Sequence, residues 1–202
     1  MIGIIDYGMG NIHSVQKAFQ SFGEDTLVVT GPKLMDKCRK LVLPGVGAFD
    51  DAAKELNSRG FVSRIKAQIA EKKPFLGICL GMQLLFDQSQ EARSEKGLGL
   101  VRGSVKMFTR DAGYKVPHMG WNQLKIAAAA CPLLKDVADK SYVYFCHSFY
   151  VEPAQPEGIA ATTEYGINFT SVIWQDNLFG VQFHPEKSQE AGLKMVKNFV
   201  EL

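Results

Sequence analysis

The stretch Pro74–Phe86, PFLGICLGMQLLF, changes character at a single cysteine. Its apolar run Phe75–Ile78 is short and ends at turn residues, which is typical of a buried parallel strand. A helix is expected to follow over Leu80–Gln88. The stretch therefore predicts a strand, a sharp turn and a helix, with Cys79 at the turn. Because a free cysteine is more often a small buried hydrophobe, a chemical role for Cys79 needs further support.

The turn has the form G-x-C-x-G, the pattern of a nucleophile elbow with cysteine in place of the usual serine. In such an elbow the nucleophile takes a strained backbone conformation, and a side chain at Gly77 or Gly81 would crowd it. The turn lifts the sulfur out of the sheet, and the dipole of the following helix favours a thiolate. By itself the pattern leaves two readings equally open: an elbow, or a buried cysteine in a glycine-bounded turn.

Short apolar runs alternate with helical patterns through the first half of the chain. The predicted strands are Ile2–Tyr7, Thr26–Val29, Lys40–Gly45 and Phe75–Ile78. Between them, apolar residues recur at three- and four-residue steps over Ile12–Phe22 and over Phe61–Lys73. This alternation predicts an α/β fold: a three-layer, mostly parallel central sheet with helices on both faces, flavodoxin-like in outline, with the site at the carboxyl ends of the strands.

The second half of the chain is rich in β-forming residues and turns, which predicts antiparallel strands added to the same sheet. A last helix is expected to begin at a Ser188 cap and to turn Leu193, Val196 and Val200 inward. No internal repeat, low-complexity tract or linker interrupts the pattern. We therefore expect one domain over residues 1–202.

Composition and charge exclude several classes of function. The chain is 46% hydrophobic and 22% charged, with a net charge of only +2 and no long run of like charge, so we expect neither a nucleic-acid nor a membrane partner. Residues 1–11 carry no basic leader and predict a first strand rather than a signal peptide. The four cysteines are far apart and form no C-x-x-C pair, which favours a reduced, cytoplasmic protein without a zinc site.

A nucleophilic cysteine needs a base, and His184 in GVQFHPEKS is the best placed of the four histidines. Residues i and i+2 of an extended chain point the same way, so Glu186 can orient the His184 imidazole. Pro185 fixes one backbone angle between them. Alone, the segment is more typical of a surface turn; together with the elbow it predicts a set of nucleophile, base and orienting carboxylate in the order Cys79, His184, Glu186.

Acyl chemistry at Cys79 also needs donors for an oxyanion. The N–H of Leu80, directly after the nucleophile, is one candidate. The segment Leu43–Phe49, LPGVGAF, supplies others at Gly45, Val46 and Gly47, because glycine lets a strand-end backbone approach a ligand. A simple strand-to-helix turn explains these residues equally well.

Together, PFLGICLGMQLLF and GVQFHPEKS resemble the triad, or class I, glutamine amidotransferases. Five further segments extend the resemblance to the glutaminase subunits of imidazole glycerol phosphate synthase, a group within that family: Asp6–Asn11, Leu43–Phe49, Lys96–Val101, Pro117–Asn122 and Tyr144–Tyr150. The resemblance spans nearly the whole chain. The elbow and the His-Pro-Glu segment mark the superfamily, whereas DYGMGN and PHMGWN point to this group.

The resemblance implies a definite reaction. Cys79 attacks the side-chain amide of L-glutamine, His184 relays the proton, Glu186 holds His184, and the products are L-glutamate and ammonia. A separate (β/α)8-barrel cyclase subunit receives the ammonia through a channel and makes imidazole glycerol phosphate and aminoimidazole carboxamide ribotide in histidine biosynthesis. No metal or organic cofactor is implied.

The matching motifs also imply contacts. Substrate would be bound by four residues: Gln83, Glu91, Ser148 and Phe149. Asn11 and Trp121 match positions at the interface with the synthase, although Trp121 alone fits a core residue equally well. His118 and His147 are expected to be structural, and the three remaining cysteines are expected to be packing residues.

Three alternatives stay open at this point. The first is a glutaminase serving another ammonia-using synthase, either in pyridoxal phosphate synthesis or in a surface-sugar pathway. The second is a catalytically silent binding subunit, and the third is a cysteine hydrolase of peptides or esters. Flanking glycines around Val46 also suggest that the free subunit leaves its oxyanion hole unformed until a partner turns a peptide unit.

Overall fold

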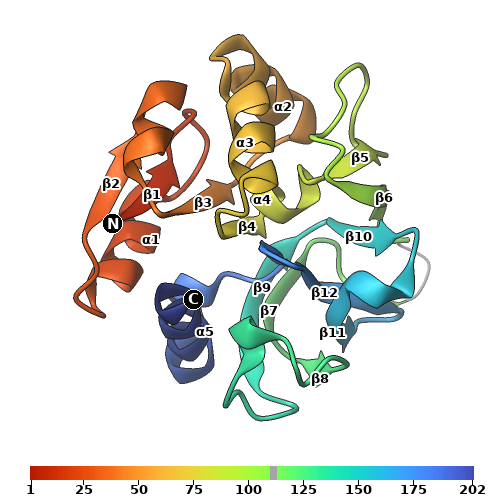
Figure 1. Ribbon diagram of the computed structural model, residues 1–202. Coiled ribbons are helices and arrows are strands. Elements are labelled where there is room, and N and C mark those ends of the chain that lie inside the picture. The colour runs from red at the N-terminus through yellow and green to blue at the C-terminus, as the bar shows by residue number, and fades with distance from the viewer. Residues whose placement is uncertain (110–112) are drawn as a thin grey trace.

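The computed structural model describes residues 1–109 and 113–202 and confirms the α/β class (Figure 1). The helices are α1 (Ile12–Gln20), α2 (Phe49–Ser58), α3 (Phe61–Ala70), α4 (Leu80–Gln83) and α5 (Gln189–Glu201). The strands of the first half are β1 (Ile2–Ile5), β2 (Thr26–Val29), β3 (Lys40–Gly45), β4 (Phe75–Cys79) and β5 (Phe86–Ser89). Those of the second half are β6 (Val101–Met107), β7 (His118–Gln123), β8 (Lys125–Ile126), β9 (Tyr142–His147), β10 (Phe149–Pro153), β11 (Ile159–Glu164), β12 (Asn168–Gln175) and β13 (Leu178–Val181).

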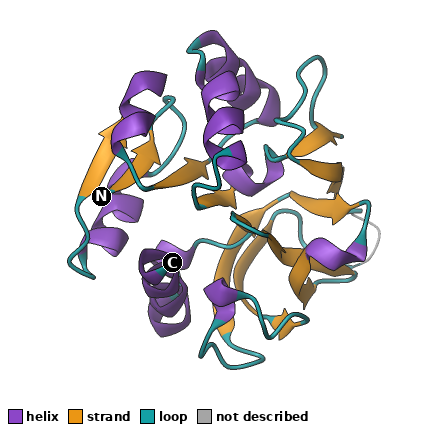
Figure 2. Ribbon diagram, viewed as in Figure 1, coloured by secondary structure: helices purple, strands orange, loops and turns teal. Residues whose placement is uncertain are grey.

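Most of these strands form one sheet whose main path runs β2-β1-β3-β4-β13-β12-β10-β6-β5 (Figure 2). Strands β2, β1, β3, β4 and β13 pair in parallel. Beyond β13 the pairs with β12, β10 and β6 are antiparallel, and β11 and β8 branch from β12. The four strands predicted in the first half are confirmed, and so are the antiparallel additions.

The register of three neighbouring strands decides where the sequence motifs meet. Gly45 at the end of β3 lies opposite Cys79 at the end of β4, and Val181 at the end of β13 lies opposite Ile78. Parallel strands present their carboxyl ends at the same edge of a sheet. The LPGVG segment, the elbow and the segment leading to His184 therefore leave the sheet side by side.

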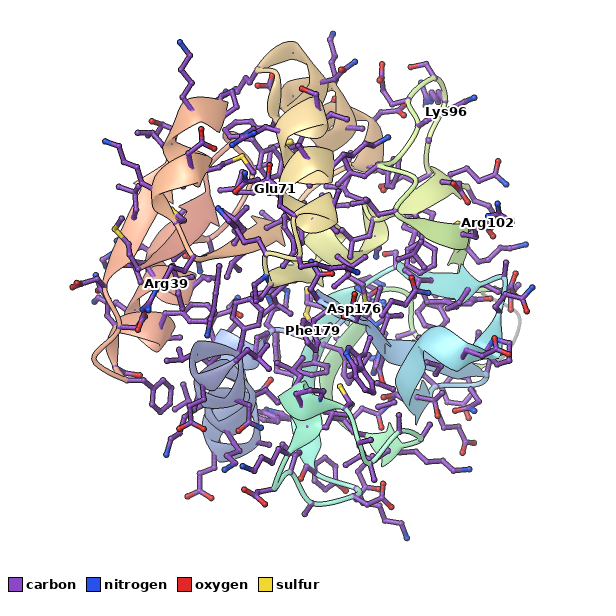
Figure 3. All side chains as sticks on the ribbon, in the orientation of Figure 1. Arg39, Glu71, Lys96, Arg102, Asp176 and Phe179 are labelled. Carbon is purple, nitrogen blue, oxygen red and sulfur yellow. The ribbon has the colours of Figure 1, made fainter. Side chains whose placement is uncertain are left out.

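Two apolar cores lie on the two faces of the sheet. Because side chains alternate along a strand, Val42 and Leu76 pack in one core with α1 and α5, whereas Leu41 and Phe75 pack in the other with α2 and α3. Buried Phe179 belongs to the first core, while Lys96 and Arg102 lie at the periphery of the molecule (Figure 3). Since both cores draw on strands from both halves of the chain, we propose that residues 1–202 form a single domain.

The helix predicted over Leu80–Gln88 is wrong beyond its first turn, because α4 ends at Gln83 and β5 begins at Phe86. The segment after β5 folds back on it: the Leu98 amide donates to the Leu84 carbonyl at 2.7 Å. A Cβ at Gly97 would lie 2.0 Å from the Phe86 carbonyl oxygen, so only glycine permits this approach. So short a helix offers the sulfur a much smaller dipole than the one expected.

Three further differences from the predictions concern local structure. β7 and β9 pair with each other in a separate two-stranded sheet rather than joining the central one. Helix α2 was not predicted, although Asp50 and Asp51 in its first turn are a helix-start signal. Helix α5 begins next to Ser188 as expected, but the Ser188 side chain makes no capping bond.

Candidate active site

A cavity of about 350 Å³ opens at the carboxyl ends of β3, β4 and β13. It brings together most of the residues singled out from the sequence. Its lining is Val46, Gly47, Cys79, Leu80, Gln83, Glu91, Pro117, Tyr144, Cys146, His147, Ser148, Phe149, His184 and Lys187.

The backbone at Cys79 has the strained geometry of a nucleophile elbow. Its φ is 55° and its ψ is −111°, a region that residues with a side chain rarely occupy. The glycines on either side make the turn possible: a Cβ at Gly77 would lie 2.7 Å from the Gly81 carbonyl oxygen, and a Cβ at Gly81 would lie 1.9 Å from the Leu43 carbonyl oxygen. The elbow is thus packed directly against β3, and its sulfur borders the cavity.

His184 and Glu186 form a buried pair beside this sulfur. The His184 Nδ1 lies 2.9 Å from Glu186 Oε1, and both side chains are almost fully buried. Burial alone would lower the pKa of His184. Hydrogen bonds to Cys79 and Glu186 and the negative charges of these two residues outweigh burial and raise the pKa to about 10. A carboxylate that accepts from Nδ1–H leaves Nε2 to exchange a proton with sulfur. The arrangement favours a protonated imidazole beside the Cys79 sulfur.

Ser188, predicted as a helix cap, instead fixes the segment that carries His184. Its hydroxyl donates to the His184 carbonyl at 2.6 Å and accepts from the Tyr144 amide at 2.9 Å. The His184 amide in turn donates to the Tyr144 carbonyl at 2.9 Å. β9 and the His-Pro-Glu segment are therefore clamped together, which restricts where the imidazole can lie.

Three of the four predicted oxyanion donors line the cavity, and the fourth, Gly45, does not. Val46, Gly47 and Leu80 line the cavity, and Gly47 has a φ of 100°. Gly45 is buried beneath them, where a Cβ would lie 2.7 Å from the hydroxyl oxygen of Tyr7. The PGVG segment thus has the backbone freedom at Gly47, and the close packing at Gly45, that make glycine necessary.

The predicted substrate residues border the same cavity, and each of the four already makes a hydrogen bond within the protein. Gln83 donates from Nε2 to the Phe149 carbonyl at 3.0 Å. Glu91 accepts from the Phe49 amide at 3.0 Å through Oε2, and burial raises the pKa of Glu91. Ser148 also lines the cavity, and its carbonyl accepts a hydrogen bond from the Phe108 amide at 3.1 Å. Contact with glutamine would therefore fall to the remaining atoms of these residues.

The two predicted interface residues lie outside the cavity. Asn11 caps α1, with Oδ1 accepting from the Ser14 amide at 3.3 Å. Trp121 is 46% exposed on β7 and packs edge-on against Tyr144, so it is not a core residue. Met119 and Tyr142 share this exposed apolar face, 61% and 57% exposed respectively. An apolar face of this kind at the rim of a site is typical of a docking surface.

Two residues for which the sequence predicted no role in the site, Cys146 and Gln182, contact the Cys79 sulfur. Cys146, expected to be a packing residue, lines the cavity, and its carbonyl accepts from the Cys79 thiol at 3.9 Å. Gln182 is fully buried and donates to the Cys79 sulfur at 3.8 Å. His118 and His147 form the hydrogen-bonded buried pair expected of structural histidines. A polar residue two positions before a candidate base was a signal for Gln182.

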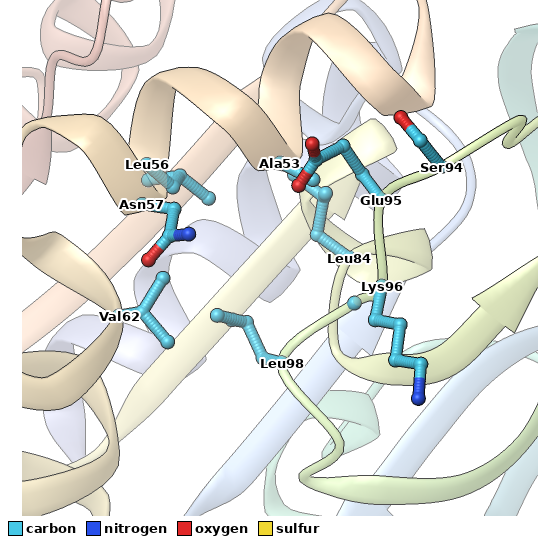
Figure 4. A pocket seen from close by; sticks show the side chains of 10 residues that line it. Ala53, Leu56, Asn57, Val62, Leu84, Ser94, Glu95, Lys96 and Leu98 are labelled. Atoms are coloured by element: carbon cyan, nitrogen blue, oxygen red, sulfur yellow. The ribbon is translucent and has the colours of Figure 1, made fainter.

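A second cavity, of about 340 Å³, lies between α2, α3 and residues 94–98 (Figure 4). Its lining includes neither cysteine nor histidine, so it offers no Cys–His pair for acyl transfer. Within the two described ranges, no cluster of three or more His, Cys, Asp or Glu side chains is placed to hold a metal ion. In the same ranges, no helix is long and apolar enough to cross a bilayer.

Comparison with known proteins agrees with this geometry. The family model of class-I glutamine amidotransferases matches residues 3–202. The imidazole glycerol phosphate synthase subunit HisH of Geobacter metallireducens is 49% identical, with 98% of this chain and 96% of that protein covered. HisH of Geobacter sulfurreducens is also 49% identical, over 100% of this chain and 98% of that protein.

Solved structures show the same fold at low sequence identity. A structure described as PurLQS from Thermotoga maritima superposes with a TM-score of 0.78 at 17% identity, covering 99% of this chain and 97% of that one. A crystal structure of a glutamine amidotransferase gives 0.77 at 16% identity, covering 99% and 97%. Taken with the family match and the HisH relatives, these findings place the chain in the class I glutamine amidotransferase family, within the group of imidazole glycerol phosphate synthase HisH subunits.

Proposed function

We propose that this protein is the glutaminase subunit of an imidazole glycerol phosphate synthase, that it hydrolyses L-glutamine to L-glutamate and ammonia, and that it works in the cytoplasm in histidine biosynthesis. The observation that carries the proposal is the strained Cys79 elbow beside the buried His184–Glu186 pair, 2.9 Å apart, in a cavity of about 350 Å³. The class-I glutamine amidotransferase match over residues 3–202 and the HisH relatives disfavour the peptide hydrolase.

In the first half-reaction, the Cys79 thiolate attacks the side-chain amide carbon of glutamine. The negative charge that develops on the amide oxygen is stabilised by the Leu80 N–H and by an N–H of the Gly45–Gly47 segment. Protonated His184 gives its proton to the departing nitrogen, and Glu186 steadies the ring throughout. Ammonia leaves, and a glutamyl thioester remains on Cys79.

In the second half-reaction, neutral His184 takes a proton from water as the water attacks the thioester carbon. The same N–H donors stabilise the second oxyanion. Glutamate departs, and the proton on His184 restores the ion pair with the Cys79 thiolate. No step draws on a metal or an organic cofactor.

The ammonia would pass to a (β/α)8-barrel cyclase subunit in a heterodimer. The exposed apolar face of Met119, Trp121 and Tyr142 lies on the two-stranded sheet of β7 and β9, and β9 also contributes Tyr144 and Cys146 to the cavity lining. A partner seated there, with Asn11 at its edge, would cover the mouth of the site. Val46 is 45% exposed beside that mouth, so a partner can also reach the PGVG segment.

Partner contact with this segment would explain how the activity is controlled. Glycines on both sides of Val46 make rotation of a peptide unit inexpensive, so the free subunit can rest with the N–H turned away from the substrate. A missing oxyanion donor lowers the rate by roughly a hundred- to a thousandfold. We expect the free chain to be slow and the complex fast.

The deciding measurement is glutamate release from L-glutamine by wild type and Cys79→Ala, with and without the barrel cyclase and its nucleotide ligand. Strong stimulation by that partner, abolished by Cys79→Ala, is the expected result. Activity that ignores this partner but responds to a pyridoxal phosphate or surface-sugar synthase would reassign the pathway. Absence of activity with every synthase would favour a silent binding subunit.

A further inference from the structure

Gln182 is the buried residue in contact with the Cys79 sulfur for which the proposed mechanism has no use. Its side chain is fully buried directly after β13, two residues before His184. Both ends of its amide are engaged: Oε1 accepts from Gln83 Nε2 at 3.2 Å, and Nε2 donates to Cys79 Sγ at 3.8 Å. A buried amide whose oxygen and nitrogen both have hydrogen-bond partners is held in one orientation, and its neighbours decide which way the Gln182 amide faces.

The orientation follows from a backbone carbonyl that can only accept. The Phe149 carbonyl accepts from Gln83 Nε2 at 3.0 Å and from His147 Nδ1 at 2.7 Å. The nitrogen of Gln83 is thereby identified, and its second hydrogen points at Gln182. The atom of Gln182 that meets it must be the oxygen, which turns the NH₂ group of Gln182 towards sulfur.

Two histidines, His147 and His118, continue this chain of hydrogen bonds, and the donor and acceptor of each bond are fixed in the same way. Because His147 Nδ1 carries the hydrogen, the neutral ring accepts at Nε2 from His118 Nδ1, 3.0 Å away. His118 Nε2 then accepts from Asn122 Nδ2 at 3.3 Å. Burial lowers the pKa of His118 to about 4 and of His147 to about 3, so both rings stay neutral near pH 7 and the chain of bonds keeps its direction.

The sulfur of Cys79 has a choice of partners that depends on its protonation. As a thiol it donates to the Cys146 carbonyl at 3.9 Å. As a thiolate it can only accept, and the N–H of Gln182 is then the fixed donor on its buried side. The same N–H gains little from a neutral thiol, because hydrogen bonds to a charged acceptor are the stronger ones.

We propose that Gln182 is a positioning residue for the glutaminase reaction: its NH₂ group, aimed by Gln83 and the Phe149 carbonyl, holds the Cys79 thiolate in place for attack and favours it over the thiol. The inference deepens the proposed function and rests on it for the identity of the reaction. The contact with sulfur, however, is testable without glutamine or a partner.

The test is the rate of iodoacetamide alkylation at Cys79 in the full chain, followed by peptide mass spectrometry from pH 4.5 to 9. Only a thiolate reacts appreciably, so the pH midpoint reports how strongly the site favours it. In Gln182→Met, which cannot donate, we expect the midpoint to rise by about one pH unit and the rate below it to fall about tenfold. In Gln182→Glu, a carboxylate facing sulfur is expected to raise the midpoint further.

Gln68→Met is the matched control. Gln68 is another buried glutamine, 1% exposed, whose Nε2 donates to Glu71 on the far side of the sheet. We expect Gln68→Met to leave the midpoint unchanged. A midpoint within about 0.2 pH units of wild type, the precision of such titrations, in either folded Gln182 variant would overturn the proposal. Because alkylation needs no glutamine, a failed glutaminase assay leaves this result readable.

Discussion

Gly81→Ala tests the reasoning that ties the elbow to the sheet. A Cβ at Gly81 would lie 1.9 Å from the Leu43 carbonyl oxygen, whereas real Cβ contacts stay beyond 3.0 Å, so β3 and the elbow must separate by about 1.1 Å. Both groups are backbone, so no side chain can swing away. Overpacking of this kind costs about 1–3 kcal/mol or more, and each kcal/mol lowers the melting temperature of a domain this size by about 2–4 °C. We take the upper end and expect a loss of about 6–12 °C.

The same displacement should damage the chemistry. Moving β3 from the elbow also moves the PGVG segment relative to Leu80, and a misplacement of about 1 Å costs on the order of a hundredfold in rate. The assays are thermal unfolding by circular dichroism and glutamate release in the presence of the barrel cyclase. A variant that remains folded at the assay temperature but loses activity separates the two effects.

Gly31→Ala is the matched control, because Gly31 is extended at a φ of −159° and a Cβ there meets nothing within 4 Å. We expect it to leave both the melting temperature and the rate close to wild type. If Gly81→Ala melts and turns over like Gly31→Ala, the close packing of the elbow on β3 is not what holds Cys79, and the argument fails.

Three further predictions follow from the same geometry. Glu186→Gln removes the negative partner of His184 and should lower glutamate release by about a hundredfold or more, and a loss below threefold would contradict the orienting role. Burial lowers the pKa of His118 and His147 below the ordinary 6.5, so the unfolded chain binds more protons in acid. Stability should therefore fall as the pH drops below about 6.5, by up to about 1.4 kcal/mol per pH unit for each ring, and His118→Phe should flatten the melting temperature between pH 7 and pH 5. Trp121→Ala should weaken cyclase binding about tenfold or more in a titration and leave the melting temperature of the free chain unchanged, since its ring is 46% exposed.

The stability contributed by His184 has the opposite sign. Its pKa is raised to about 10 by Cys79 and Glu186, against the effect of burial. The pair therefore contributes fully below the ordinary 6.5 and loses its contribution as the pH rises through about 10. Lowering the pH from 7 to 5 therefore weakens the His118–His147 pair while His184 stays protonated.

Local patterns in the sequence were sufficient for the parallel half of the fold. Apolar runs such as Lys40–Gly45 and Phe75–Cys79 are buried on both faces, so their composition alone marks them as strands. The spacing of Gly77 and Gly81 likewise predicted the elbow, because a side chain at either position would prevent the strained turn at Cys79. The strand runs and the approach of Gly77 to Gly81 depend on neighbours along the chain, which is why the sequence alone predicts them. The fit of Gly81 against Leu43 depends on the pairing of β3 with β4.

The length of α4 could not be predicted in this way. Leu84–Gln88 continues an apolar pattern that suits a helix, but residues 97–101 return to pair with it, and the amide of Leu98 reaches the carbonyl of Leu84. A contact across more than ten residues outweighs local propensity.

Short sequence patterns were enough to predict the α/β class and the set Cys79, His184 and Glu186, because the spacing within each pattern obeys local backbone geometry. How these segments meet depends on the tertiary structure. The register of β3, β4 and β13 brings Gly45, Cys79 and the approach to His184 to one edge, and the fixed Phe149 carbonyl aims the amide of Gln182 at sulfur. Contacts of this kind join residues far apart in the chain, and their geometry is set by strand pairing and packing rather than by any single segment.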